Sequence, residues 1–179
     1  MAENGARRIR LGMVGGGTGA FIGYVHRIAA RIDGDYDLVA GALSSRPEVA
    51  RESGKNLGLA EDRIYTSYEE MARAEAARPD GIEAVAIVTP NHMHYGPAKA
   101  FLEAGIHVIC DKPITSTIED ARALAQVQPK NGAKFLLTHN YTGYPLVRQA
   151  RELVASGALG TIRVVQAEYP QDWLTEATG

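Results

Sequence analysis

The chain has 179 residues, enough for one ordinary domain and part of another. Hydrophobic residues make up 45% and charged residues 22%, as in a core-forming globular protein, and the net charge of −2 offers no basic excess for a phosphate backbone. We therefore expect no nucleic-acid partner. No apolar run approaches the roughly 18 residues of a membrane span, and the N-terminus lacks a secretion signal, so we expect no membrane association and a cytoplasmic location.

Short apolar runs alternate with helical segments along most of the chain, a pattern typical of a parallel sheet covered by helices. Six strands are expected, at residues 9–14, 36–43, 64–65, 82–88, 106–110 and 134–138. They predict an α/β fold with a doubly wound parallel Rossmann sheet over residues 1–140, in the strand order 3-2-1-4-5-6 of that fold.

The remaining residues, 141–179, have a different pattern. Pro145 opens an amphipathic helix, and residues 161–169 alternate as a half-buried strand of another sheet. We interpret them as a linker helix and the first strand of an incomplete α+β C-terminal substrate domain. Trp173 is either a substrate-side aromatic residue or a hydrophobic anchor.

A glycine-rich turn follows the first expected strand. Gly15, Gly17 and Ala20 form a G-x-G-x-x-A pattern, with Thr18 and Gly19 between them. In a dinucleotide-binding loop one glycine makes the turn, the next admits the pyrophosphate, and a small residue lets helix and strand pack closely. The helix N-terminus then offers free N–H groups to the phosphates. The alternatives are a tight turn without a ligand and a P-loop, which the absence of Gly-Lys-Ser/Thr excludes.

The end of the second strand indicates which dinucleotide is bound. Asp33, Asp35 and Asp37 precede most of that strand, at the wrong end for a contact with the adenosine ribose. The other end carries Ser44, Ser45 and Arg46 and has no carboxylate. Hydroxyl groups and a guanidinium would accept a 2′-phosphate, so NADP is favoured over NAD. In the alternative, Arg46 faces solvent and NAD binds through the serines.

Three further polar loops follow the fourth, fifth and sixth strands, at residues 89–94, 111–113 and 139–141. In an open α/β sheet the ligand lies beyond the carboxyl ends of the strands, so these loops share one edge. Together with the glycine loop, the motifs TPNHMH, DKP and HNYTGYP resemble those of the Gfo/Idh/MocA family, the relatives of glucose-fructose oxidoreductase and inositol dehydrogenase. The segment VRQARELVASGALGTIRVVQAEY also resembles that family's passage into its second domain.

The resemblance implies a role for each of these loops. Lys112 corresponds to the lysine of a Glu-Lys-Pro motif, beside the nicotinamide and the substrate hydroxyl, where an ammonium stabilises the charge that develops on oxygen. Asp111 replaces the usual Glu and would reach the ribose on a shorter stem. Pro113 is the family's proline and could follow a cis bond. The remaining positions implied to line the cofactor are Thr89, Pro90, Asn91, His94 and Asn140.

Simpler interpretations stand beside these. Lys112 could be an ordinary surface lysine. His92 and His94 could suggest zinc together with Cys110 or His107, but no fourth ligand group is evident and we expect no metal. Cys110, the only cysteine, is read as a small buried strand residue in a reducing compartment.

We therefore expect an NAD(P)-dependent oxidoreductase that transfers hydride to or from a sugar, a polyol or a related hydroxyl compound. The family's substrate pocket lies in a second domain, so this chain would be the cofactor-binding part, inactive alone and a homo-oligomer in full-length form. The alternatives are a non-catalytic NAD(P)-binding module that needs a partner chain and an S-adenosylmethionine-dependent methyltransferase. The TPN and DKP loops argue against the methyltransferase.

Overall fold

The structure is a computed structural model that describes residues 7–170. The chain forms two compact units, Met1–His139 and Asn140–Gly179. The first unit contains the sheet and five helices, and the second contains the last helix. Trp173 lies outside the described residues.

The sheet of the first unit has five parallel strands in the order β2-β1-β3-β4-β5. They are β1 (Ile9–Gly15), β2 (Tyr36–Ala42), β3 (Ala84–Val88), β4 (His107–Cys110) and β5 (Phe135–Leu137). The expected α/β fold with a doubly wound parallel sheet is confirmed. Because parallel strands end at the same edge, every loop that follows a strand starts at one side of the unit.

One expected strand is reduced to a single contact. Ile64 forms an isolated parallel bridge with Gly41 of β2, so the prediction of a strand at residues 64–65 was wrong. Ile64 nevertheless lies beside β2, where the expected strand order 3-2-1-4-5-6 puts the third strand. A 3₁₀ helix ends at Arg63 and Ser67 already caps the next helix, so only three residues remain for pairing.

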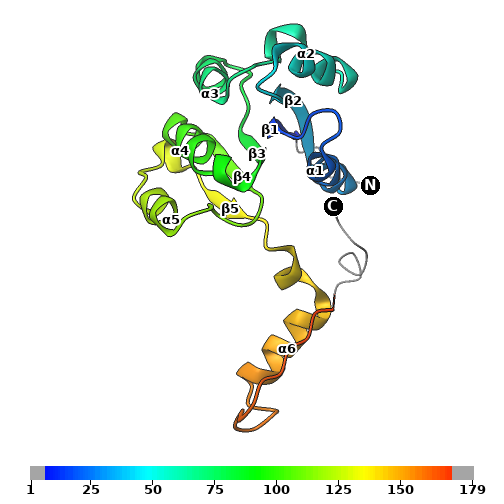
Figure 1. Ribbon diagram of the computed structural model, residues 1–179, viewed down its shortest axis with the longest axis vertical. Coiled ribbons are helices and arrows are strands. Elements are labelled where there is room, and N and C mark those ends of the chain that lie inside the picture. Colours follow the sequence, from blue (N-terminus) through cyan, green and yellow to red (C-terminus); the bar gives the residue numbers. More distant parts are fainter. Residues whose placement is uncertain (1–6, 171–179) are drawn as a thin grey trace, which may run out of the picture. The chain divides into compact units, whose positions relative to one another are not determined.

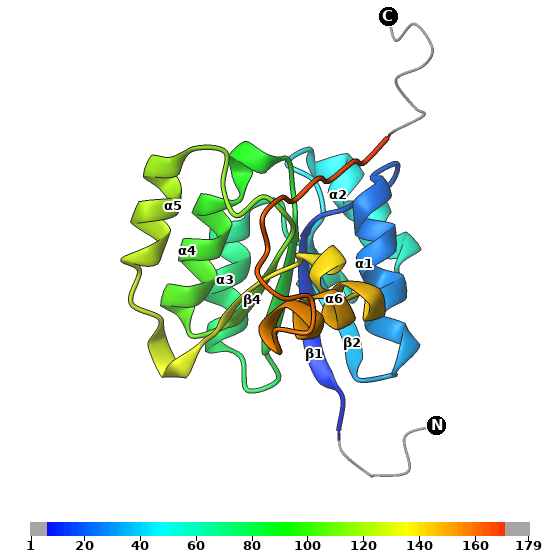
Figure 2. The same ribbon diagram turned by 90° about the horizontal axis from the view of Figure 1, so that it is seen from below.

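Helices cover both faces of the sheet (Figures 1 and 2). They are α1 (Phe21–Ile32), α2 (Pro47–Asn56), α3 (Tyr68–Ala77), α4 (Tyr95–Ala104) and α5 (Ile118–Ala125). The helices α3, α4 and α5 lie on one face, and α1 and α2 lie on the other. Their ends follow the local sequence: Pro47 starts α2, the Thr117 hydroxyl accepts from the amide of Asp120 at the start of α5, and Gly105 ends α4 with φ of 84°.

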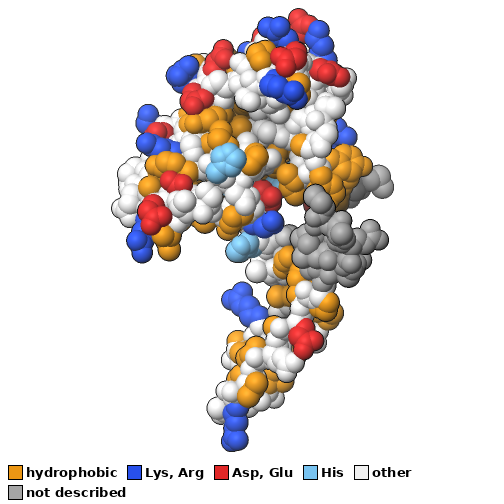
Figure 3. All heavy atoms as spheres, in the orientation of Figure 1, with side chains coloured by type: hydrophobic (Ala, Val, Ile, Leu, Met, Phe, Trp, Pro, Cys, Tyr) orange, Lys and Arg blue, Asp and Glu red, His pale blue; other side chains and the backbone are white. Residues whose placement is uncertain are grey.

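The core explains why β3 is almost continuously apolar. All five of its residues are buried, because helices pack against both of its faces. Phe101 of α4 is fully buried on one side, and Met13 of β1 on the other. A buried ion pair between Arg63 and Glu75 joins the 3₁₀ helix Glu61–Arg63 to α3. On the face drawn in Figure 3, acidic and basic side chains are mixed over α2 and α3.

The second unit contains a 3₁₀ helix (Asn140–Gly143) and α6 (Pro145–Ala155). Pro145 opens α6 as expected. Residues 161–169 form no strand, contrary to the expectation, because a strand needs a neighbour to pair with and the described part of this unit supplies none. The Tyr141 and Tyr169 hydroxyl groups lie 2.9 Å apart instead.

Candidate functional site

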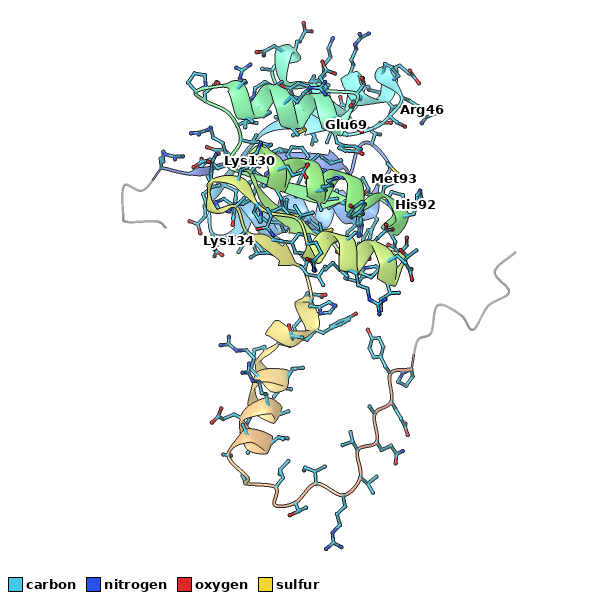
Figure 4. All side chains as sticks on the ribbon, turned by 90° about the vertical axis from the view of Figure 1, so that its left-hand side faces the viewer. Arg46, Glu69, His92, Met93, Lys130 and Lys134 are labelled. Carbon is cyan, nitrogen blue, oxygen red and sulfur yellow. The ribbon has the colours of Figure 1, made fainter. Side chains whose placement is uncertain are left out.

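A cavity of about 660 Å³ follows the carboxyl ends of β1, β2 and β3. The residues that line it are 14–18, 20, 42–46, 49, 66–69, 88–90, 92, 93 and 97. Figure 4 shows Arg46, Glu69, His92 and Met93 at this edge of the unit, with Lys130 and Lys134 at the opposite edge. The volume lies in the range of ordinary ligand pockets.

The glycine loop forms one wall of the cavity. Gly15 and Gly16 have φ of 80° and 72°, a region that favours glycine. A Cβ on Gly17 would lie 2.8 Å from the carbonyl oxygen of Leu43, so this position has no room for a side chain. The Ser53 hydroxyl accepts a 2.9 Å hydrogen bond from the Thr18 amide and fixes the loop to α2.

The N-terminus of α1 follows this loop directly. Its N-cap residue, Ala20, makes no side-chain hydrogen bond to the first turn, and that turn holds no acidic residue. The first amides of α1 are therefore not capped by its own N-cap side chain and, with the helix dipole, favour an anion. The glycine loop and the N-terminal end of α1 therefore form a site that fits a pyrophosphate.

The close contact between loop and helix is made by a residue that the sequence motif did not indicate. We expected Ala20 to provide it, but a Cβ built on Gly23 would lie 2.4 Å from the Cα of Gly16. Gly23 lies one helical turn further along α1. Arg27 reaches back from the following turn and donates a 2.8 Å hydrogen bond to the Gly16 carbonyl oxygen.

The loop after β2 forms the second wall. Ser44, Ser45 and Arg46 all line the cavity, and the Arg46 amide donates to the Ser44 hydroxyl at 3.1 Å. Asp35 lies at the other end of the strands, where its carbonyl oxygen accepts from the amide of Ile9 at the start of β1.

Residues that sequence reasoning missed form the third wall. Residues 66–69 lie before and in the first turn of α3, and Glu69 brings a carboxylate to the cavity. The Ser67 hydroxyl donates to Glu69 and holds the pKa of that carboxyl below its usual value. The Ile64–Gly41 bridge places this segment beside β2, and only the folded chain shows it.

The loop after β3 contributes Thr89, Pro90, His92 and Met93 to the cavity. His94, expected to line the cofactor, is fully buried. Its Nδ1 lies 2.7 Å from the Pro113 carbonyl oxygen and its Nε2 lies 3.0 Å from that of Thr89. The side chain therefore connects two loops and does not line the cavity, and its expected contact with the cofactor stays a prediction.

The loop after β4 carries Asp111, Lys112 and Pro113 at the same edge of the sheet but outside the cavity wall. The Lys112–Pro113 peptide bond is cis. The Lys112 side chain is exposed and has no hydrogen bond or ion pair with a described residue. The Asp111 carboxylate accepts a 2.9 Å hydrogen bond from the Thr138 hydroxyl, and its Oδ1 lies 3.6 Å from Nε2 of His26.

The other expected site residues are placed as follows. Asn91 opens the 3₁₀ helix Asn91–Met93 and is exposed, and Gly19 is exposed with φ of 85°. Neither of them lines the cavity. Asn140 begins the second unit. These positions stay predictions.

No group of three or more potential metal ligands occurs among residues 7–170. Cys110 is fully buried, and burial together with the neighbouring Asp111 raises the pKa of its thiol to about 12. His107 accepts a hydrogen bond from the Lys134 amide through Nδ1.

Residues 9–152 match the model of the oxidoreductase family with an NAD-binding Rossmann fold, Gfo/Idh/MocA. The chain belongs to this family. Two curated relatives cover nearly all of it: the uncharacterized oxidoreductase YfiI of Bacillus subtilis is 41% identical over 174 residues, 94% of this chain and 44% of the relative. Levoglucosan dehydrogenase of Pseudarthrobacter phenanthrenivorans is 31% identical over 174 residues, which are 93% of this chain and 42% of the relative.

Two crystal structures are also similar to this chain. An oxidoreductase from Sinorhizobium meliloti is 63% identical with a TM-score of 0.88, covering 95% of this chain and 47% of that one. An inositol dehydrogenase homolog from Azotobacter vinelandii, in complex with NADH and myo-inositol, is 45% identical with a TM-score of 0.82, covering 88% and 42%. The chain thus spans less than half the length of these relatives. In the described part of the chain, no helix is long and apolar enough to cross a membrane.

Proposed function

We propose that this chain is the cofactor-binding part of an NAD(P)-dependent oxidoreductase that acts on a CH–OH group of a sugar, a polyol or a related compound. The observation that carries the proposal is the continuous cavity from the glycine loop to Ser44–Arg46 at the carboxyl edge of the sheet. It matches a dinucleotide laid across a doubly wound sheet, with pyrophosphate at the α1 N-terminus and adenosine beyond β2.

The residues of the site fit the cofactor. Gly15, Gly16 and Gly17 leave the backbone open where phosphates approach, and the first turn of α1 carries no acidic side chain that would repel them. The cofactor, when bound, supplies the hydride acceptor or donor. Asp111 and Lys112 lie at the end of β4, farther along the same edge, where the nicotinamide half would lie.

Lys112 is proposed as the catalytic residue of this half. Its exposed ammonium has no described partner and is therefore free to hold the substrate oxygen. A positive charge at that oxygen stabilises the negative charge that the oxygen carries once its proton has left, or that it gains when hydride adds to the carbonyl carbon in the reverse direction, and orients the carbon toward the cofactor. The substrate pocket is proposed to belong to a second domain, of which residues 141–179 are proposed to be the beginning.

NADP is proposed as the preferred dinucleotide. Ser44 and Arg46 line the adenosine end of the cavity, and the loop between β2 and α2 has no carboxylate before Glu48. A guanidinium and a hydroxyl group bind a 2′-phosphate, whereas a carboxylate in this loop would repel it. The alternative is NAD bound through the serines. The NADH complex of the Azotobacter vinelandii homolog supports a nicotinamide cofactor in general.

The proposal is tested by calorimetric titration of this chain with NADPH, NADH and S-adenosylmethionine. Binding of a nicotinamide dinucleotide alone supports it, and binding of S-adenosylmethionine alone contradicts it. Where the dinucleotide binds, oxidation of a panel of sugars and polyols by a full-length version separates an oxidoreductase from a non-catalytic binding module, which would turn over none of them.

A further inference from the structure

A partly buried contact joins α1 to the loop that carries Lys112. Nε2 of His26 lies 3.6 Å from Oδ1 of Asp111, and the two side chains are only 12% and 16% exposed. The Thr138 hydroxyl, just after β5, donates a 2.9 Å hydrogen bond to the same oxygen. The Asp111 amide also donates to the Ile87 carbonyl oxygen at 2.9 Å. The side chains of His26, from α1, and of Thr138, from the end of β5, thus meet at one carboxylate oxygen of Asp111.

The two carboxylate oxygens of Asp111 differ in their surroundings. Oδ1 accepts from Thr138 and faces His26, whereas Oδ2 has no hydrogen bond with any described residue. A carboxylate offers about four acceptor sites, so Oδ2 remains available to a ligand. Since Asp111 directly precedes Lys112, the contacts at Oδ1 also fix the chain where the ammonium begins.

The imidazole of His26 faces this carboxylate from α1. Burial lowers the pKa of its imidazole, and the facing Asp111 offsets part of that effect. The lowered pKa favours the uncharged ring, and its Nε2 faces Oδ1 of Asp111 across 3.6 Å.

We propose that His26 and Thr138 are positioning residues that hold Oδ1 of Asp111 so that Oδ2 accepts hydrogen bonds from the ribose hydroxyls beside the nicotinamide. The inference rests on the proposed function and deepens it, because it assigns one wall of the nicotinamide half of the site to α1 and β5. Neither residue touches the cofactor itself.

The test compares two ligands that differ in the half of the site they fill. One is whichever of NADPH and NADH binds this chain more tightly, and the other is its adenosine half, 2′,5′-ADP or ADP. The variants are Thr138→Val, which removes the hydroxyl at constant shape, and His26→Leu, which removes the N–H. The matched variants Thr138→Ser and His26→Gln keep a donor at these positions.

We expect Thr138→Val and His26→Leu each to lower the affinity for the dinucleotide by about 5- to 20-fold, since each removes a contact to a charged group. The affinity for the adenosine half should stay within about twofold, and the matched variants should recover most of the loss. On an Asp111→Ala background, Thr138→Val should add little, because the oxygen that accepts from Thr138 is already gone.

Each other outcome has a distinct meaning. An equal loss for both ligands would show a purely structural role and overturn the inference, and so would unchanged dinucleotide affinity in Thr138→Val. If His26→Leu fails to fold, Thr138→Val and its serine partner decide the question. If the unaltered chain binds no dinucleotide, the proposed function itself fails.

Discussion

Arg27 donates a 2.8 Å hydrogen bond to the carbonyl oxygen of Gly16, and so connects the middle of α1 to the loop at its start. Gly16 is buried between β1 and α1, and its carbonyl oxygen has no N–H partner within the loop. The conformation of the proposed pyrophosphate loop therefore depends on a side chain two helical turns away.

Arg27→Gln should lower the free energy of unfolding by about 1 kcal/mol, less than a fully buried charged hydrogen bond because Arg27 is only half-buried. It should also weaken dinucleotide binding several-fold, since Gly16 loses its support. Urea unfolding and calorimetry measure the two effects. Arg31→Gln, one turn further along α1 on an exposed side chain, is the matched control and should change neither.

Gly23→Ala should destabilise the chain although alanine favours helices. The gain of about 0.5–1 kcal/mol in helix propensity is smaller than the roughly 1–3 kcal/mol cost of overpacking. The new Cβ would meet the backbone of Gly16, which has no flexible atoms to move aside. Gly54→Ala in α2 is the control. The three atoms nearest to its Cβ would all belong to the flexible side chain of Ile64, so the urea midpoint should fall by less.

Arg46→Ala should reduce affinity for NADPH by about ten- to hundredfold and leave NADH within a few fold, because a charge-assisted contact to the 2′-phosphate is lost. Fluorescence titration of both cofactors measures the ratio. Equal affinities in the unaltered chain, or an unchanged ratio in the variant, would remove the NADP assignment.

This chain alone should bind cofactor and turn over no polyol, because a substrate domain can contribute about 7–11 kcal/mol through positioning. In a full-length version, Lys112→Ala should lower kcat by about a hundredfold or more and leave cofactor affinity within a few fold. Lys134→Ala, at the opposite edge of the unit, is the control (Figure 4). Robust dehydrogenation by these 179 residues alone would contradict the prediction.

Stability should decline in acid partly through Glu83. Its hydrogen bond from Arg7 is the main cause that lowers the pKa of the Glu83 carboxyl from 4.5 to about 2. A carboxyl with a lowered folded-state pKa contributes stability above its unfolded pKa and loses that contribution as pH falls toward the folded value. Between about pH 4.5 and 2, Glu83→Gln should therefore show a shallower loss of unfolding free energy than the unaltered chain. Parallel slopes would refute the assignment.

The sheet could be predicted because the two sequence signals that indicate it, apolar strand runs and helix caps, are both local. Ile82–Val88 is apolar almost throughout, as a strand buried on both faces must be, and helix caps such as Thr117 act within one turn. The two errors concern pairing. Too few residues next to Ile64 lie outside the flanking helices to form a strand. Residues 161–169 alternate like a strand but have no strand to pair with in the described part of the chain.

The candidate site could be predicted only in part. Chain order places the loops after parallel strands at one edge of the sheet, and Gly17, Arg46 and Lys112 lie in such loops. The sequence could not show that Glu69 would reach the same cavity, since that depends on how α3 packs. Nor could it show the approach of His26 to Asp111, which are 85 positions apart and meet only when α1 covers the sheet.

The imidazole of His94 also limits how this scaffold can be altered. Its two ring nitrogens each face a carbonyl oxygen, that of Thr89 in one loop and that of Pro113 in the next. A chimera that imports only one of these loops from a relative would have to match the position of the other carbonyl to within a few tenths of an ångström. Loop exchange aimed at a new substrate should therefore transfer residues 89–94 and 111–113 as a pair.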